Sequence, residues 1–290
     1  MNTHQAGITQ RVVTLRPEER GIYLMTRKIY QECQELKDVR AGMVNFFLQS
    51  THAALSINEN ADPTVRTDLE GALERIVPPE NGLQQSRLKT SLVGVSLDVP
   101  IHNGQLAFGT WQGLYLCDWT GKAGSSGLNL VVTLTELESA QATRKVTLKA
   151  PRRGCHLVTD EVAGAVDTVS SCSAGLLNLA IRHTSASLTV NENADPTVRT
   201  DMEAALNRIV PEKWNQEFFE HTMEGPDDMP AHVKSTLIGA SVTVPVCEGR
   251  IALGTWQGVY LCEHRDVGGW GSGHEREVIV TLRPSRSAPS

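Results

Sequence analysis

The sequence predicts an α+β protein built from two tandem copies of one small domain, each with a mixed or antiparallel β-sheet packed by helices. The peptide NENADPTVRTD occurs twice, at 58–68 and 191–201. A second block, LKTSLVGVSLDVPIHNGQLAFGTWQGLYLCD, returns as VKSTLIGASVTVPVCEGRIALGTWQGVYLCE. A repeat this long indicates a duplicated domain and not a solenoid unit. Strand-like and helix-like stretches follow each other without strict βαβ alternation, which favours an α+β fold.

The domain boundaries follow from the spacing of the two blocks. The first block repeats at an offset of 133 positions and the second at 145, so copy two carries 12 extra residues between them. The polar stretch TELESAQATRK, near 134–145, has the composition of a linker. We therefore place copy one at 9–137 and copy two at 144–284.

Each copy repeats the same order of elements. A strand-like opening (RVVTLRP or KVTLKAP) leads to a helical stretch and then to a second strand, MVNFFLQ or LLNLAIR. Near the end of copy two, SVTVPV, RIALGTWQGVYLCE and EVIVTLRP are strand-like and are separated by turn residues. The sheet of each copy is therefore expected to take strands from both halves of the domain.

The helix after NENADP is the most strongly predicted helix. Asp62 and Asp195 are suitable N-caps, and the prolines that follow them suit the first helical position. Pro211 ends the helix in copy two. Helical spacing puts five apolar residues of copy two on one face: Val198, Met202, Ala205, Leu206 and Ile209.

Composition and charge limit the class of protein. Hydrophobic residues make up 40% of the 290 residues and charged residues 21%, a globular balance. The formal net charge of -6 argues against nucleic acid or an anionic membrane as the main partner. No apolar run is long enough to cross a bilayer, the N-terminal stretch has no secretory pattern, and the six cysteines form no CxxC pair. We expect a cytoplasmic protein.

The histidines of copy two are the first candidates for chemistry. Along its strand His183 shares the parity of Leu177, Leu179 and Ile181, so it lies on the apolar face where the strand ends. The matched residue in copy one is Ser50. By this pattern His183 is either a hydrogen-bonded core histidine or a ligand.

The 12-residue insertion brings further histidines to copy two. The stretch FFEHTMEGPDDMPAHVKST contains His221, Asp228 and His232. Copy one has no equivalent of His221 and has Arg87 in place of His232, while Trp119 replaces His264 further on. Three histidines with a carboxylate or water suit Zn²⁺. The alternative is a charged, solvated loop with incidental histidines.

The repeated peptide has an independent rationale. A loop feeding a capped helix presents N–H groups that suit phosphate or carboxylate. Arg66 and Arg199 lie in the first turn of that helix, where a cation opposes the helix dipole and favours a nearby anion. Because copy one keeps the peptide without the histidines, a purely structural capping loop is the alternative. We expect the peptide to shape the fold in both copies and to join a site in copy two only.

These residues resemble the YjbQ-type family, described as secondary thiamine-phosphate synthase enzymes. The resemblance is carried by RHTSASLTVNENADPTVRTDMEAALNRIVP, HTMEGPDDMPAHVKSTLIG and GRIALGTWQGVYLCEHRD, and it covers copy two, about 144–284. Copy one resembles the family in its NENADP and GTWQG blocks and departs from it at the histidines. We therefore expect a degenerate, structural copy one and a site in copy two.

The resemblance implies a small α+β domain in threefold assembly and a divalent metal, with Zn²⁺ favoured, held by His183, His221 and His232. It also implies a phosphorylated small-molecule ligand. In that setting Arg199 would hold a phosphate, and Glu192 would orient a ligand or shuttle a proton. The other candidate substrate contacts are Asn191, Asn193, Asp228, Trp256, Gln257 and His264.

Three functions are open at this point. The first is thiamine phosphate synthesis, in which hydroxymethylpyrimidine diphosphate joins thiazole phosphate and pyrophosphate leaves. The second is a metal-dependent hydrolase acting through the same site. The third is an oligomeric module that binds a metal or phosphate without catalysis.

Overall fold

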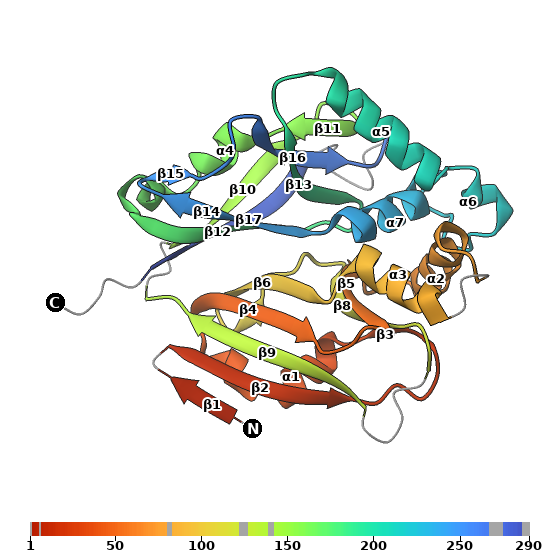
Figure 1. The fold of residues 1–290 in the computed structure, drawn as a ribbon, viewed down its shortest axis with the longest axis horizontal. Coiled ribbons are helices and arrows are strands. Elements are labelled where there is room, and N and C mark those ends of the chain that lie inside the picture. The colour runs from red at the N-terminus through yellow and green to blue at the C-terminus, as the bar shows by residue number, and fades with distance from the viewer. Residues whose placement is uncertain are drawn as a thin grey trace.

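The computed structural model describes residues 2–5, 7–79, 83–121, 127–138, 142–266 and 275–285. Figure 1 shows two similar α+β domains stacked on each other, copy one ending at strand β9 and copy two beginning at β10. All strand pairs in the described residues are antiparallel. The predicted fold class, two tandem α+β domains, is confirmed. No helix in the described ranges has the length and apolar character needed to span a bilayer.

Copy one contains two sheets, in the strand orders β1-β2-β9-β4-β6-β7 and β3-β8-β5. Its strands are β1 (Asn2–Gln5), β2 (Ile8–Leu15), β3 (Gly21–Leu24), β4 (Ala41–Leu48), β5 (Ala53–Glu59), β6 (Ser96–His102), β7 (Gln105–Leu106), β8 (Gln112–Asp118) and β9 (Leu128–Glu136). Its helices are α1 (Thr26–Glu32), the 3₁₀ helix η1 (Gln34–Asp38), α2 (Thr64–Ile76) and α3 (Leu83–Val93).

Copy two repeats this plan with sheets in the orders β10-β17-β12-β14-β15 and β11-β16-β13. Its strands are β10 (Thr143–Lys149), β11 (Gly154–Leu157), β12 (Ala174–Ile181), β13 (Ala186–Glu192), β14 (Ser241–Cys247), β15 (Arg250–Ile251), β16 (Gln257–Glu263) and β17 (Glu275–Pro284). Its helices are α4 (Thr159–Ala163), η4 (Asp167–Ser171), α5 (Thr197–Ile209), α6 (Trp214–Glu217) and α7 (Asp228–Ile238).

The linker is shorter than its composition predicts, because strands extend into it from both sides. Strand β9 continues to Glu136 and β10 begins at Thr143. Another difference concerns RIALGTWQGVYLCE, which forms two strands, β15 and β16, because the GTW segment makes a turn between them. The sequence pattern alone does not show that turn, since the residues on both sides of it are strand-like.

Helices α2 and α5 begin one residue later than predicted, at Thr64 and Thr197. The aspartates still cap them, since the Thr64 and Thr197 amides donate to Oδ1 of Asp62 and Asp195, each at 2.8 Å. Only Leu206 of the predicted apolar face of α5 is buried, and Ile209 is 44% exposed. The equivalent face of α2 is buried, because copy two covers it.

The two copies share their hydrophobic core. One apolar cluster joins residues of α2 and β8 in copy one to Trp214, Phe219, Met229 and Val233 of copy two. Figure 1 shows α7 of copy two lying over α2 and α3 of copy one. The junction between the copies is therefore a packed interior and not a loose domain contact.

Glycines let the backbones approach closely at this junction. A Cβ added to Gly109, in the GTWQG loop of copy one, would lie 2.3 Å from the Arg182 carbonyl oxygen of copy two. Next to it, Gln112 donates to the carbonyls of Ile181 and His183, at 3.0 and 2.9 Å. The GTWQG loop of copy one thus holds the segment of copy two that carries His183.

Candidate metal centre at the junction of the two copies

His221 and His232 are held by the insertion of copy two and by its docking on copy one. His221 follows α6, and its amide and that of Glu220 donate to Asp68 Oδ2 of copy one, at 2.8 and 2.9 Å. His232 lies in α7, one turn after Asp228. Both imidazoles are almost fully buried, and their ring centroids are 5.4 Å apart. Copy one therefore positions both histidines of copy two.

The carboxylate that faces both histidines is Glu59, which ends β5 in the first NENADP peptide. Its Oε1 accepts the Asp62 amide at 3.1 Å. Its Oε2 lies 3.3 Å from His232 Nε2 and 3.7 Å from His221 Nε2. The side chain is thus fixed at one oxygen and presents the other to the imidazoles.

The second ring nitrogen of each histidine has its own partner in copy one. His221 Nδ1 is 2.8 Å from Asp62 Oδ2, and His232 Nδ1 is 2.9 Å from Asn58 Oδ1. The Asn58 amide orientation is set because its Nδ2 donates to the His232 carbonyl and to Thr236 Oγ1, at 3.0 and 2.8 Å. With Nδ1 donating, each neutral imidazole directs its Nε2 lone pair toward Glu59. Metal-binding histidines are oriented in this way.

Asp228 adds a second carboxylate to the centre. Its Oδ2 lies 2.9 Å from His221 Nε2 and 3.7 Å from His232 Nε2, and its Oδ1 is paired with Arg265. Among the described residues, neither Asp228 Oδ2 nor His221 Nε2 completes a hydrogen bond despite their proximity. Asp228 Oδ2 therefore lies next to the imidazoles of His221 and His232, beside the group formed by Glu59 and the two histidines.

The pKa values of these groups are shifted by their mutual contacts in the direction that favours the charged forms. Burial alone would lower the pKa of His221, but Asp228 and Asp62 outweigh it and raise that pKa to about 9. The pKa of His232 is raised in the same way by Asp228 and Glu59. Burial would raise the pKa of Glu59, yet His232 and His221 lower it. Positive charge between the carboxylates and the imidazoles is therefore stabilised, whether protons or a metal ion supply it.

The donor set fits a metal ion. One ligand atom each from Glu59, His221 and His232 lies within 4.8 Å of the others. Two imidazoles with one carboxylate form a protein donor set that Zn²⁺ uses in catalytic sites. These three ligand residues come from both copies.

His183 lies outside this cluster. Its Nδ1 accepts the Ser185 amide at 3.0 Å, which leaves the ring hydrogen on Nε2 when the imidazole is neutral. Burial and the charges of Arg276 and His232 lower its pKa to about 3, so it is neutral near pH 7. In this arrangement Nε2 of the neutral imidazole carries the ring hydrogen and can donate a hydrogen bond.

The other predicted residues of copy two are also apart from the cluster, except Asp228. His264 is buried inside copy two, where its Nε2 is 2.8 Å from Ser187 Oγ. The rest lie on the second NENADP peptide and the second GTWQG loop, whose surface is exposed or half-buried: Asn191, Glu192, Asn193, Arg199, Trp256 and Gln257.

Asn58, Glu59 and Asp62 could not be predicted from the sequence comparison, because it sought all residues of the site within copy two. The two peptides are identical, so local sequence gives no basis for choosing which one faces the histidines. The signal that was available is the insertion itself, since 12 additional residues in copy two provide the chain that reaches Asp68 of copy one.

Comparison with known proteins agrees with this duplicated plan. The family model "UPF0047 protein YjbQ-like" matches residues 11–136 and again 144–285. The YjbQ protein of Escherichia coli O157:H7 is 50% identical over 140 residues, which cover 48% of this chain and 96% of that protein. The YugU protein of Bacillus subtilis is 49% identical over 81 residues, 28% of this chain and 58% of that protein.

Solved structures also match. An uncharacterised YjbQ/UPF0047 protein from Clostridium acetobutylicum is 30% identical, with a TM-score of 0.39, and the match covers 48% of this chain and 98% of that one. A hypothetical protein from Aeropyrum pernix is 28% identical, with a TM-score of 0.39 over 49% and 98% of the two chains. With the family model matching both halves, the chain belongs to the UPF0047 (YjbQ-like) family and carries two copies of its domain.

Proposed function

We propose that the chain binds one divalent cation, Zn²⁺ in the first instance, between Glu59, His221 and His232, and uses it on a phosphorylated small molecule. The observation that carries this proposal is the convergence of one carboxylate oxygen and two imidazole Nε2 atoms within 4.8 Å. When bound, such a cation neutralises charge that develops on a phosphate or leaving pyrophosphate oxygen.

The surroundings support a cation at this point. Glu59 Oε2, Asp228 Oδ2 and the two Nε2 lone pairs are all acceptors, so they stay together only with positive charge between them. Both imidazoles are already oriented by Asp62 and Asn58, which lowers the cost of arranging the ligands. Arg265 holds Asp228 in place and compensates part of its charge.

Arg66 supports an anionic substrate. It lies in the first turn of α2, four residues after Asp62. Burial raises the pKa of Tyr115, whose hydroxyl donates to the Glu59 carbonyl oxygen, and the positive charge of Arg66 opposes that rise. A guanidinium next to a helix N-terminus suits phosphate recognition. We assign to Arg66 the phosphate-binding role that the sequence suggested for its repeat partner Arg199.

Thiamine phosphate synthesis, with release of pyrophosphate, is the first candidate reaction, and it is the one that the family resemblance implies. A metal-dependent hydrolase acting through the same site is the second candidate. A metal-binding module without turnover is the third.

Metal analysis of the purified protein is the first test, and we expect about one equivalent of zinc-like metal per chain. Two equivalents, or none after supplementation, would overturn the proposal. The loaded protein is then assayed for pyrophosphate release from the two thiamine precursors and for hydrolysis of p-nitrophenyl phosphate. A Glu59→Gln protein, which keeps the side-chain shape, is the control in both assays. Stoichiometric metal with no turnover in a broad screen would identify the binding module.

A further inference from the structure

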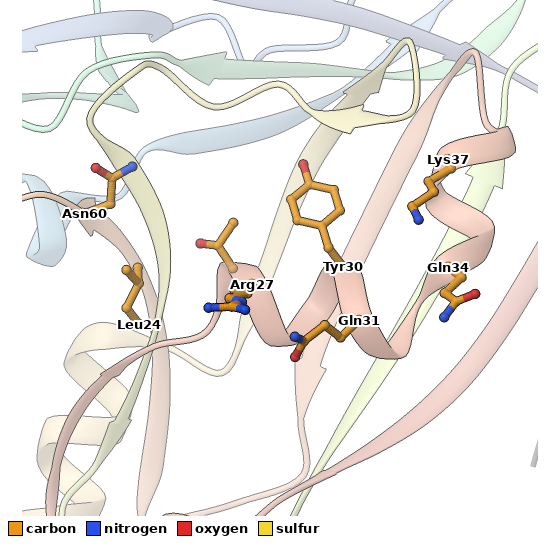
Figure 2. Close-up of a pocket in the computed structure, with 8 residues that line it drawn as sticks. Leu24, Arg27, Tyr30, Gln31, Gln34, Lys37 and Asn60 are labelled. Atoms are coloured by element: carbon orange, nitrogen blue, oxygen red, sulfur yellow. The ribbon is translucent and has the colours of Figure 1, made fainter.

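Copy one has a groove along α1 and η1, away from the histidines. Its volume is about 630 Å³, within the range of small-molecule sites. Figure 2 shows the side chains that line it, with Tyr30 between Arg27 and Lys37. The lining residues are Leu24, Thr26, Arg27, Tyr30, Gln31, Gln34, Lys37 and Asn60.

Helical spacing explains why four long polar side chains lie in one row. Arg27 and Gln31 are four residues apart on α1, so they share a face. Gln34 and Lys37 are three residues apart on η1, where side chains at that spacing are aligned. The row therefore follows from two consecutive short helices and places a cation toward each end.

The lining offers hydrogen-bond donors to a ligand and no carboxylate. Thr26 Oγ1 accepts the Leu114 amide at 2.9 Å, and Tyr30 Oη accepts the Leu106 amide at 2.8 Å. Each hydroxyl hydrogen therefore remains to be donated. Arg27 and Lys37 add charged donors, and the described lining residues contain no acid. The Tyr30 ring and Leu24 supply an apolar wall.

Copy two provides a natural comparison at the matched positions. The matched positions are Asp160 in α4, Gly164 directly after it, and Asp167 and Ser170 in η4, and Ala163 replaces Tyr30. The row thus changes from two cations to two anions, and the aromatic wall is lost. The shared fold does not require a basic groove, because copy two keeps a shorter α-helix followed by a 3₁₀ helix at this place without the basic residues.

We propose that the groove of copy one binds a small organic anion, a phosphate or a carboxylate, whose flat apolar part packs on Tyr30. Arg27 and Lys37 bind the anionic group or groups, and the two glutamine amides, Gln31 and Gln34, contact the polar edge. None of the proposed metal ligands lines this groove, and Asn60 is the lining residue that lies next to one of them, Glu59, in the chain.

Ligand-observed NMR titration of the full chain tests the proposal with phenyl phosphate, benzoate and benzyl alcohol as probes. We expect saturable binding of at least one anion and none of the alcohol, with affinity falling as salt is added. A double substitution, Arg27→Asp with Lys37→Ser, introduces the residues of copy two and should weaken anion binding at least tenfold. The double variant removes two charged donors at once, so a tenfold loss is a low bound.

Matched variants distinguish binding in this groove from binding elsewhere on the protein. Tyr30→Ala should weaken phenyl phosphate more than inorganic phosphate, because only the former uses the ring. Asp160→Arg in copy two should leave anion binding unchanged. Preference for phenyl phosphate or for benzoate identifies which anion the groove takes. Absence of saturable binding of either anion, or equal binding by the Arg27/Lys37 double variant, would overturn the proposal.

Discussion

The two identical NENADPTVRTD peptides have different surroundings in the same molecule. Asn58 of the first is completely buried and is bonded to α7, whereas Asn191 of the second is exposed. Both peptides end their strands alike, with a tyrosine hydroxyl donating to the glutamate carbonyl. The local conformation is thus common to both, and only the neighbouring surface differs. The two peptides therefore differ in which residues of the other copy pack against them, and not in their own conformation.

The GTWQG loops show the same contrast. Gln112 is 3% exposed and bonds to copy two, while Gln257 lies exposed in the second loop. Each glutamine Oε1 accepts the amide of the glycine three residues earlier, at 2.8 Å in both copies. The loop conformation is therefore independent of docking, and the Nε2 donor of Gln112 is the part that copy two uses.

Replacing the glutamate of each peptide should give the largest difference between the copies. Glu59→Gln should lower metal affinity ~100-fold or more, because losing only an outer partner already costs roughly 10–100-fold. Glu192→Gln should leave affinity unchanged, because no histidine of the cluster faces it. Isothermal titration with Zn²⁺ measures both. Equal affinities in the two variants would remove Glu59 from the centre.

The paired residues His232 and Arg87 test the other side of the junction. His232→Ala should abolish or strongly weaken metal binding, because it removes a ligand atom. Arg87→Ala, at the matched position of copy one, should change neither metal content nor activity. Metal content and thermal melting are measured together, so that an unfolded variant is not read as a lost ligand. Normal metal content in His232→Ala contradicts the assignment.

The aspartates of the two peptides should differ less than the glutamates. Asp62→Asn should weaken metal binding roughly 10–100-fold, because Asp62 orients His221 without being a ligand. Asp195→Asn should have no effect on metal. Asparagine keeps the oxygen that caps the helix, so both proteins should melt near the wild-type temperature. A large loss of stability in either variant would show that the main role of the aspartate is to cap the helix and not to orient His221.

The GTWQG glycines predict a difference in stability. Gly109→Ala places a methyl group against the Arg182 carbonyl and should lower the free energy of unfolding by about 1–3 kcal/mol. Gly254→Ala meets only the Gln257 side chain at 3.3 Å or more and should cost less. Chemical denaturation of the two variants gives the comparison. If Gly254→Ala lowers the free energy of unfolding more than Gly109→Ala does, then close contact at the junction does not determine how well these glycines tolerate substitution.

Changing the pH should give the smallest effect. Measuring thermal stability and Zn²⁺ affinity over the same pH range should show how protons and metal compete at the centre. The pKa of His221 is raised in the folded metal-free protein to about 9, from 6.5. Its contribution to stability is therefore complete below about pH 6.5 and is lost as the pH rises through 9. Zn²⁺ binding should strengthen over the same range, because protons no longer compete. Metal-free melting that stays constant from pH 6.5 to 9 would contradict this.

Much of the fold could be predicted because it depends on local and periodic signals. The duplicated blocks predicted two domains, and the Asp-Pro pairs located α2 and α5 to within one residue. The exposure of the apolar face of α5 could not be predicted, because burial of a helix face depends on whether another element covers it. The same reason explains why Leu69 is buried in copy one while its counterpart Met202 remains half-buried.

By itself, the sequence determined the duplication, the α+β class and the presence of His221, His232 and Asp228 in copy two alone. Only the tertiary structure decided which glutamate meets those histidines, and it brought Glu59 of copy one to them in place of Glu192. The physical reason is that identical peptides have identical local preferences, so contacts more than 150 residues apart in sequence, such as His221 with Asp62 and Asp68, select between them.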